Sequence, residues 1–157
     1  MDVKIINPFL TAVINIFDEM FSIIVNPGIP FLHEEESAHR WNISGILGVT
    51  GDYQGIVCFR LHKVLADKML AKSGINTSSE KERKEMVYEM IGELTNIISG
   101  NAASAINHAN IEISPPAVIM GENHKISWPR SMPVIGIPFT SSSGPFEVDV
   151  CFRQMKI

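Results

Sequence analysis

The amino-acid sequence predicts an α+β fold, in which a mostly antiparallel sheet packs against two long helices and one short helix. Two segments, residues 6–25 and about 80–107, carry apolar residues at helical spacing. The other apolar segments are short, rich in β-branched and aromatic residues, and separated by turns. Because strands joined by short turns pair antiparallel, we expect the order helix, two strands, two helices and then further strands.

The first helix is expected over residues 6–25. Asn7 can cap its start, and Pro8 suits the first turn because its missing N–H has no helical partner there. The Asn-Pro-Gly sequence at 26–28 is expected to end it. Residues 30–38 are then predicted to form a loop or the frayed start of a strand.

A hairpin is expected next, with strands over 43–50 and 56–61. Its glycines at 45, 48 and 51 recur every third residue, but the pattern is not GxGxxG and no helix follows it directly. We therefore interpret these glycines as places of close packing against a helix rather than as a phosphate-binding loop.

The two remaining helices are expected in the middle of the chain. The shorter one covers residues 64–72. The long one begins at a capping box, either Ser79 with Glu82 or Thr77 with Glu80, since both pairs have the required spacing.

Short strands fill the rest of the chain. Pro133 and Pro138 favour an edge position or a bulge for the strand that contains them, because proline cannot donate to a ladder. The expected strands are 111–113, 117–120, 126–128, 134–140 and 146–152.

Length and composition restrict the class of protein. The 157 residues fit one domain, 1–157, and 19% charged residues with a net charge of −4 argue against nucleic-acid or membrane binding. Polar residues and prolines interrupt every apolar stretch, so no segment is expected to cross a bilayer. We interpret Cys58 and Cys151, which form no CxxC pair, as buried, reduced thiols of a cytoplasmic protein, and favour this over a disulfide.

The five histidines show no spacing typical of a metal site, and no zinc site is expected. No GxSxG motif accompanies the serine-rich turn at 141–144. The histidines are His33, His39, His62, His108 and His124.

The long helix carries the most informative pattern. Unrolled at about 100° per residue, it has an apolar face and an opposite polar face. The apolar face comprises Met86, Met90, Leu94, Ile97, Ile98 and Ala105, flanked by Val87 and Ile91. The polar face comprises Glu89, Glu93, Asn96, Gly100, Ala103 and Asn107.

A glycine within this helix needs a reason. An exposed mid-helix glycine costs about 1 kcal/mol relative to alanine, and the apolar pattern continues past Gly100, so it is no cap. Three interpretations remain: plain surface, a close crossing by another element, or a face that docks on a macromolecule through Glu93, Asn96 and the depression at Gly100.

Residues 92–102, Gly-Glu-Leu-Thr-Asn-Ile-Ile-Ser-Gly-Asn-Ala, resemble the ExxNxxxG signature of the CheC/CheX/FliY family of chemotaxis phosphatases. The fold is accordingly expected to be CheC/CheX-like. Further segments resemble CheX-type chains, so that the likeness covers nearly the whole sequence. They are residues 1–9, 44–51, 114–121 and 137–139.

The number of motifs distinguishes branches of this family. CheC-type members carry the motif twice, but here the first helix has Asn15, Asp18 and Glu19 in the wrong order. The chain therefore resembles the single-site CheX branch. Glu89 stands where an aspartate is common and keeps the charge.

The resemblance implies a hydrolase that acts on the aspartyl phosphate of a CheY-like response regulator. It implies that Glu93 forms a salt bridge with a lysine of the partner, that Asn96 orients water for in-line attack, and that Gly100 permits close approach. Glu93 and Asn96 are thus the expected catalytic pair. Partner contact is expected at Glu89, Gly92, Gly100, Ala103 and Asn107.

The resemblance also implies a homodimer formed through sheet edges, and no cofactor bound by this chain. Mg²⁺ is expected in the partner response regulator. One alternative is a non-catalytic adaptor that binds a response regulator or flagellar-switch protein through the same helix face. A further alternative is a structural, sheet-forming subunit, because flagellar switch components share the fold.

Overall fold

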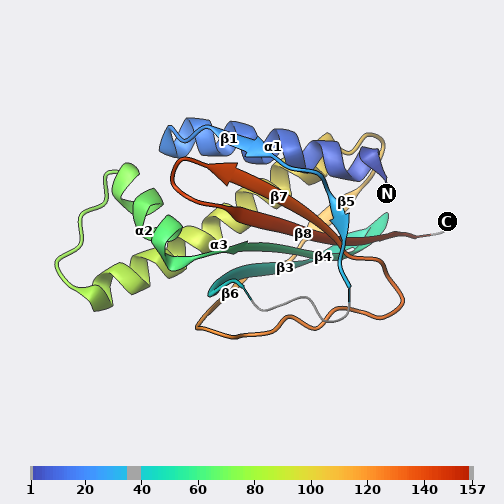
Figure 1. Ribbon diagram of the computed structural model, residues 1–157. Coiled ribbons are helices and arrows are strands. Elements are labelled where there is room, and N and C mark those ends of the chain that lie inside the picture. The colour runs from blue at the N-terminus through green and yellow to red at the C-terminus, as the bar shows by residue number, and fades with distance from the viewer. Residues whose placement is uncertain (1, 35–39, 156–157) are drawn as a thin grey trace.

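The computed structural model describes residues 2–34 and 40–155, which form three helices and a sheet of eight strands (Figure 1). Every strand pair in the described residues is antiparallel, which confirms the predicted α+β class. The helices are α1 (Val3–Phe21), α2 (Lys63–Lys72) and α3 (Glu80–Ala105). The strands are β1 (Val25–Pro27), β2 (Phe31–Leu32), β3 (Ile43–Gly51), β4 (Tyr53–Leu61), β5 (Ile111–Ile113), β6 (Ala117–Met120), β7 (Ile135–Ser141) and β8 (Phe146–Gln154).

The strand order across the sheet is β1-β7-β8-β4-β3-β5. The short strand β2 pairs with β7 beside β1, and β6 pairs with β3 beside β5. The two expected hairpins, β3–β4 and β7–β8, supply the four central strands. Along β7, Pro138 lies between the residues that pair with β1 and those that pair with β2. Its carbonyl accepts a hydrogen bond from Gly28 N at 2.7 Å.

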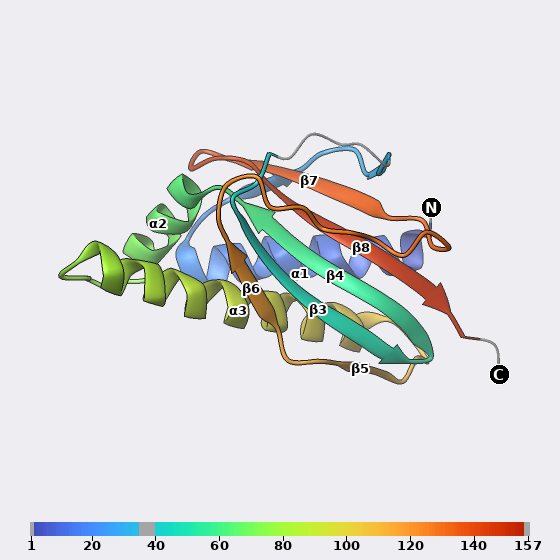
Figure 2. The ribbon, with the colours of Figure 1, turned by 90° about the horizontal axis from the view of Figure 1, so that it is seen from below.

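Helices α1 and α3 lie side by side on one face of the sheet, and α2 lies beside the first half of α3 (Figures 1 and 2). Phenylalanines form the centre of the core between α1 and the sheet. Phe17 of α1 stacks on Phe146 of β8 at 4.5 Å between ring centroids, and Phe146 stacks in turn on Phe139 of β7 at 4.9 Å. All three rings are buried, and together they fix α1 over the β7–β8 hairpin.

Helix α3 approaches β3 closely because Gly45 has no side chain. A Cβ at Gly45 would collide with the Thr95 hydroxyl and lie 3.2 Å from Ile91 Cγ2. The predicted packing of a helix against these glycines is therefore confirmed for Gly45. It is not the role of Gly48, which faces the other side of the sheet near Ser114 Oγ.

The first helix begins earlier and ends earlier than its apolar pattern predicts. Asp2 is the N-cap, and its side chain accepts from Lys4 N at 2.9 Å, so neither Asn7 nor Pro8 begins the helix. Pro8 lies inside it. Ser22, with φ of 52°, ends the helix in a left-handed conformation, and the chain turns into β1.

Two other expectations change. Residues 26 and 27 belong to β1 rather than to a turn, because they pair with β7. The strand expected at 126–128 is part of a loop between β6 and β7 instead. The short strand β2 within residues 30–34 agrees with the predicted loop or start of a strand, and residues 35–38 of that prediction lie outside the described part of the chain.

The start of α3 uses the Ser79 alternative. Ser79 is the N-cap, and its side chain accepts from Glu82 N at 3.1 Å. The capping box is incomplete, because the Glu82 carboxylate accepts a hydrogen bond from Ser78 N at 2.9 Å instead of from Ser79 N. The hydrogen bonds that Ser78 Oγ and Ser78 N donate to the Glu82 carboxylate lower the pKa of Glu82.

The other face of the sheet is crossed by the loop between β6 and β7 (Figure 2). Cys58 and Cys151 lie on neighbouring strands, and both are free and buried, as predicted. Burial raises the pKa of the Cys58 thiol to about 12, which keeps it protonated. Among the described residues, the helices are all too short or too polar to cross a bilayer.

Candidate functional site

The exposed side of α3 carries the predicted pair. Glu93 and Asn96 are both exposed, and so is Glu89 one turn before Glu93. Residues three and four apart on a helix are neighbours on its surface, so these three side chains form one short polar strip. Because α3 is a 26-residue helix anchored on the sheet, the strip has a rigid base.

The side chains of this strip are open to solvent. In the part of the chain that the structure describes, no hydrogen bond or ion pair involves the side chains of Glu89, Glu93 or Asn96. Two carboxylates one turn apart give the strip a negative field, which favours a positively charged surface on any partner.

Gly100 lies on the same side of α3, two turns after Glu93. A Cβ there would have Ile113 Cδ1 at 3.8 Å as its near neighbour, which is an ordinary contact distance. Packing within the chain therefore does not require a glycine at this position. The missing side chain leaves space on the outer surface, beside the polar strip.

The buried arc of α3 is wider than a single apolar stripe. The predicted core residues Met90, Leu94 and Ile98 are buried, but so are Thr95 and Ser99, because the helix lies between α1 on one side and β3 on the other. Met86 and Ile97 are half-buried at the rim of this arc. The full buried set is Val87, Met90, Ile91, Gly92, Leu94, Thr95, Ile98, Ser99 and Ala102.

Two residues of α3 differ from the prediction in whether they are buried or exposed. Gly92, expected at a partner contact, is buried, and a Cβ there would meet Val118 of β6 at 3.4 Å. Ala105, expected in the core, is exposed at the end of the helix, where the covering sheet has ended.

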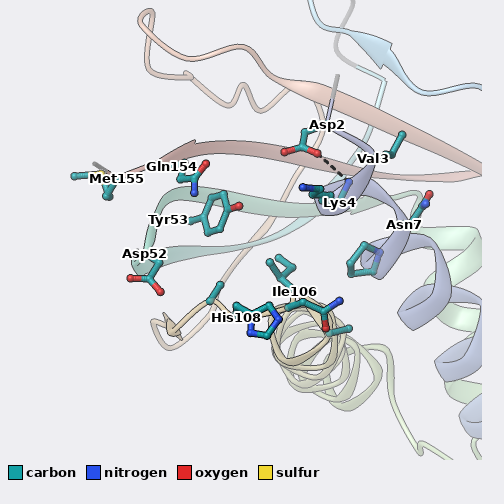
Figure 3. A pocket seen from close by; sticks show the side chains of 14 residues that line it. Asp2, Val3, Lys4, Asn7, Asp52, Tyr53, Ile106, His108, Gln154 and Met155 are labelled. Carbon is teal, nitrogen blue, oxygen red and sulfur yellow. Dashed lines mark hydrogen bonds between the residues drawn. The ribbon is translucent and has the colours of Figure 1, made fainter. Parts of the chain in front are cut away.

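The remaining predicted contacts lie toward the end of α3. Ala103 is half-buried one turn after Gly100, whereas Asn107 lies beyond the helix. Asn107 helps to line a cavity of about 730 Å³ between the start of α1, the end of α3 and the β3–β4 turn (Figure 3). Asn107 is therefore separated from the polar strip, which does not line this cavity.

Strands β5 and β6 border the site, and sequence reasoning did not assign them a part in it. Ile113 of β5 lies beside Gly100, and Val118 of β6 lies beside Gly92. No local signal reveals this, because both strands reach α3 through their pairing with β3.

The family model described as "Chemotaxis phosphatase CheX" matches residues 43–140, which is more than half of the chain and includes the polar strip of α3. The chain belongs to the CheX family. This confirms the family that the ExxNxxxG segment suggested. No curated protein gives a significant match.

Solved structures of CheX-type proteins share this fold over nearly their whole length. A CheC-like superfamily protein from Shewanella sp. PV-4 is 28% identical, with a TM-score of 0.86, covering 98% of this chain and 99% of that one. The chemotaxis protein CheX from Desulfovibrio desulfuricans is 30% identical, with a TM-score of 0.84 and coverages of 96% and 99%.

A third solved structure is a complex. The CheX–CheY–BeF₃–Mg²⁺ complex from Borrelia burgdorferi contains a chain that is 28% identical to this one, with a TM-score of 0.81 and coverages of 98% and 100%. That CheX relative therefore binds a CheY protein in the presence of BeF₃ and Mg²⁺.

Proposed function

We propose that this CheX-family protein hydrolyses the aspartyl phosphate of a CheY-like response regulator. The observation that supports this most directly is the polar strip: an exposed carboxylate and an exposed amide on the helix that carries the ExxNxxxG segment, with no hydrogen bond or ion pair to the described residues. The family match and the CheY complex of the relative from Borrelia burgdorferi support the same class of partner.

Asn96 is proposed to hold the attacking water. In the reaction, the water oxygen bonds to phosphorus, the bond from phosphorus to the aspartate oxygen breaks, and inorganic phosphate and a free carboxylate result. An acyl phosphate is already reactive, so hydrolysis needs a positioned water more than a strong base. A neutral amide can accept a hydrogen bond from that water without repelling the phosphoryl oxygens.

Glu93 is proposed to bind the partner one turn away from Asn96, through a lysine of the response regulator. An exposed carboxylate pairs well with an ammonium group that becomes desolvated at an interface. Gly100 would let the partner's backbone approach α3. Mg²⁺ is proposed to come with the response regulator, and association of two copies through a sheet edge stays a prediction.

The test is phosphate release from a CheY-like response regulator of the same cell, phosphorylated by an acyl-phosphate donor with Mg²⁺. The wild-type chain should accelerate release, and the double variant Glu93→Ala/Asn96→Ala should not. Because both side chains are exposed and make no hydrogen bond or ion pair in the described part of the chain, the variant should keep the wild-type circular dichroism spectrum and melting temperature.

Binding without acceleration by the wild-type chain would reject the enzymatic proposal and favour the adaptor. Accelerated release by a folded double variant would reject the assignment of Glu93 and Asn96. Each response regulator is assayed separately, so that a negative result with one protein is not taken for the absence of activity.

Gly100→Ala should make the protein more stable and weaken its activity toward the phosphorylated partner. The change should raise the free energy of unfolding by up to about 1 kcal/mol, because alanine is the better helix former and Ile113 leaves room for its Cβ. It should also raise KM for the phosphorylated partner, because the methyl group fills the space beside the polar strip. Urea unfolding and phosphate-release kinetics measure the two effects. A less stable variant would show that packing requires Gly100, and an unchanged KM would show that the partner does not approach there.

A further inference from the structure

A second cluster of chemically active side chains lies on the face of the sheet opposite α3. His33 follows β2, and its Nε2 lies 2.8 Å from Asp149 Oδ1 and 3.4 Å from Glu147 Oε2 of β8. The side chains of His33 and Glu147 are each 9% exposed, and that of Asp149 is fully buried. Nothing in the proposed phosphatase function uses this cluster.

The backbone places these three groups together. Side chains alternate across a strand, so Phe146 and Val148 of β8 point into the core while Glu147 and Asp149 point to the other face. His33 is fixed by its backbone, since His33 N donates to Val134 O at 2.9 Å.

A glycine makes room for the imidazole. A Cβ at Gly136 of β7 would come within 2.9 Å of His33 Nε2 and would also collide with the Phe31 ring. The neighbouring strand therefore leaves a small hollow on which His33 rests, facing the two carboxylates.

The donor set and its spacing fit a tetrahedral metal. One imidazole nitrogen and two carboxylate oxygens are ordinary ligands of a Zn²⁺ ion that keeps a fourth position for water. At bond lengths of about 2.0–2.1 Å, ligand atoms around such an ion lie roughly 3.3 Å apart. The distances of 2.8 and 3.4 Å from His33 Nε2 lie on either side of this separation, and the three ligand atoms all lie within 4.8 Å of one another.

Further polar groups lie beyond Asp149. Asp149 Oδ2 has no hydrogen bond in the described structure, and Arg60 Nη1 lies 3.7 Å from it. Arg60 Nε donates to Ser44 Oγ at 3.3 Å, and Ser44 Oγ lies 2.7 Å from His124 Nε2. Such outer groups orient metal-binding carboxylates in known sites.

Two carboxylates are costly to bury without positive charge, by several kcal/mol each. Hydrogen bonds that His33 donates to the carboxylates, to Asp149 first, raise the pKa of His33 to about 9, so in the metal-free chain a proton on the imidazole supplies positive charge beside that of Arg60. Burial raises the pKa of Asp149 to about 7. A dication in the same place would supply more charge than the proton and satisfy the same three side chains.

We propose that His33, Glu147 and Asp149 bind one Zn²⁺ ion, with water as the fourth ligand. The ion would join His33, which follows β2, to strand β8. The site lies across the sheet from the polar strip of α3.

The test is titration of the chelator-treated, desalted full chain with Zn²⁺ in a calorimeter. The wild-type chain should bind one ion per chain. His33→Ala and Glu147→Gln should each weaken binding by at least about tenfold, since each removes a ligand. His108→Asn is the matched control, because it removes an exposed imidazole and asparagine tolerates the positive φ of 58° at that position. Its affinity should equal that of the wild type.

Co²⁺ gives a second readout that requires no catalytic activity. The wild-type chain with Co²⁺ should show the visible absorption of a four-coordinate ion, and His33→Ala should not. No saturable Zn²⁺ binding by the wild type would overturn the proposal, as would equal binding by a folded Glu147→Gln variant. These outcomes are independent of the phosphatase assay, so either proposal can fail alone.

Discussion

Asn96→Ala should reduce accelerated phosphate release by about 100-fold, with little change in KM for the phosphorylated partner. The reason is that Asn96 is proposed to position water rather than to hold the response regulator, and loss of a positioning group acts on kcat. Asn96→Asp should be equally damaging, although it keeps the shape of the side chain, because a carboxylate would face the phosphoryl oxygens. Steady-state phosphate release at a series of partner concentrations separates kcat from KM.

Glu93→Ala provides the contrast. Its proposed role is to bind the partner, so KM should rise more than kcat falls, and the effect should shrink at high salt, where charge pairs are screened. Asn101→Ala is the control, since Asn101 is also an exposed amide of α3 and lies about 80° from Glu93 and about 140° from Asn96 around the helix axis. Full activity of Asn96→Asp would mean that the amide does not hold the water.

Gly45→Ala should lower the free energy of unfolding by about 1–3 kcal/mol, the usual cost of overpacking. The new Cβ would collide with the Thr95 hydroxyl, which is buried and donates to Ile91 O at 2.7 Å, so it cannot rotate away without losing that hydrogen bond. The strain should be relieved by moving α3 off β3, which would displace Glu93 and Asn96. Urea unfolding measures the stability, and phosphate release measures the displacement.

Gly48→Ala is the matched control for this prediction. It lies in the same strand, but its Cβ would have Ser114 Oγ at 3.5 Å as its nearest neighbour, so its stability should change little. Thr95→Ala should restore part of the stability of Gly45→Ala, which a double-mutant cycle measures as a coupling energy. Equal losses for the two glycine variants and no coupling would show that α3 does not rest on Gly45.

Local sequence patterns predicted much of the fold and of the candidate site. The 3.6-residue period of α3 placed Glu89, Glu93 and Asn96 on one exposed face, because a helix fixes the relative direction of its own side chains. The hairpins at β3–β4 and β7–β8 were predictable for the same reason, since their strands are adjacent in the chain and joined by short turns.

The errors arose where a residue's neighbours come from elsewhere in the chain. Gly92 and Gly100 both lie within α3, yet β6 covers Gly92 and does not cover Gly100. The expected strand at 126–128 has β-forming residues, but it crosses the outer face of the sheet without a strand to pair with. Asp2 and Asn7 are both good caps, and tertiary packing of α1 decides between them.

The sequence by itself determined the fold class, the family to which the ExxNxxxG segment belongs, and the exposed pair Glu93 and Asn96, because these depend on short spacings along the chain. Only the tertiary structure brought His33 to Asp149, 116 residues away, with Glu147 beside them. It also decided which glycines of α3 stay open to a partner. Both depend on how strands far apart in the sequence pair in one sheet, which no local period encodes.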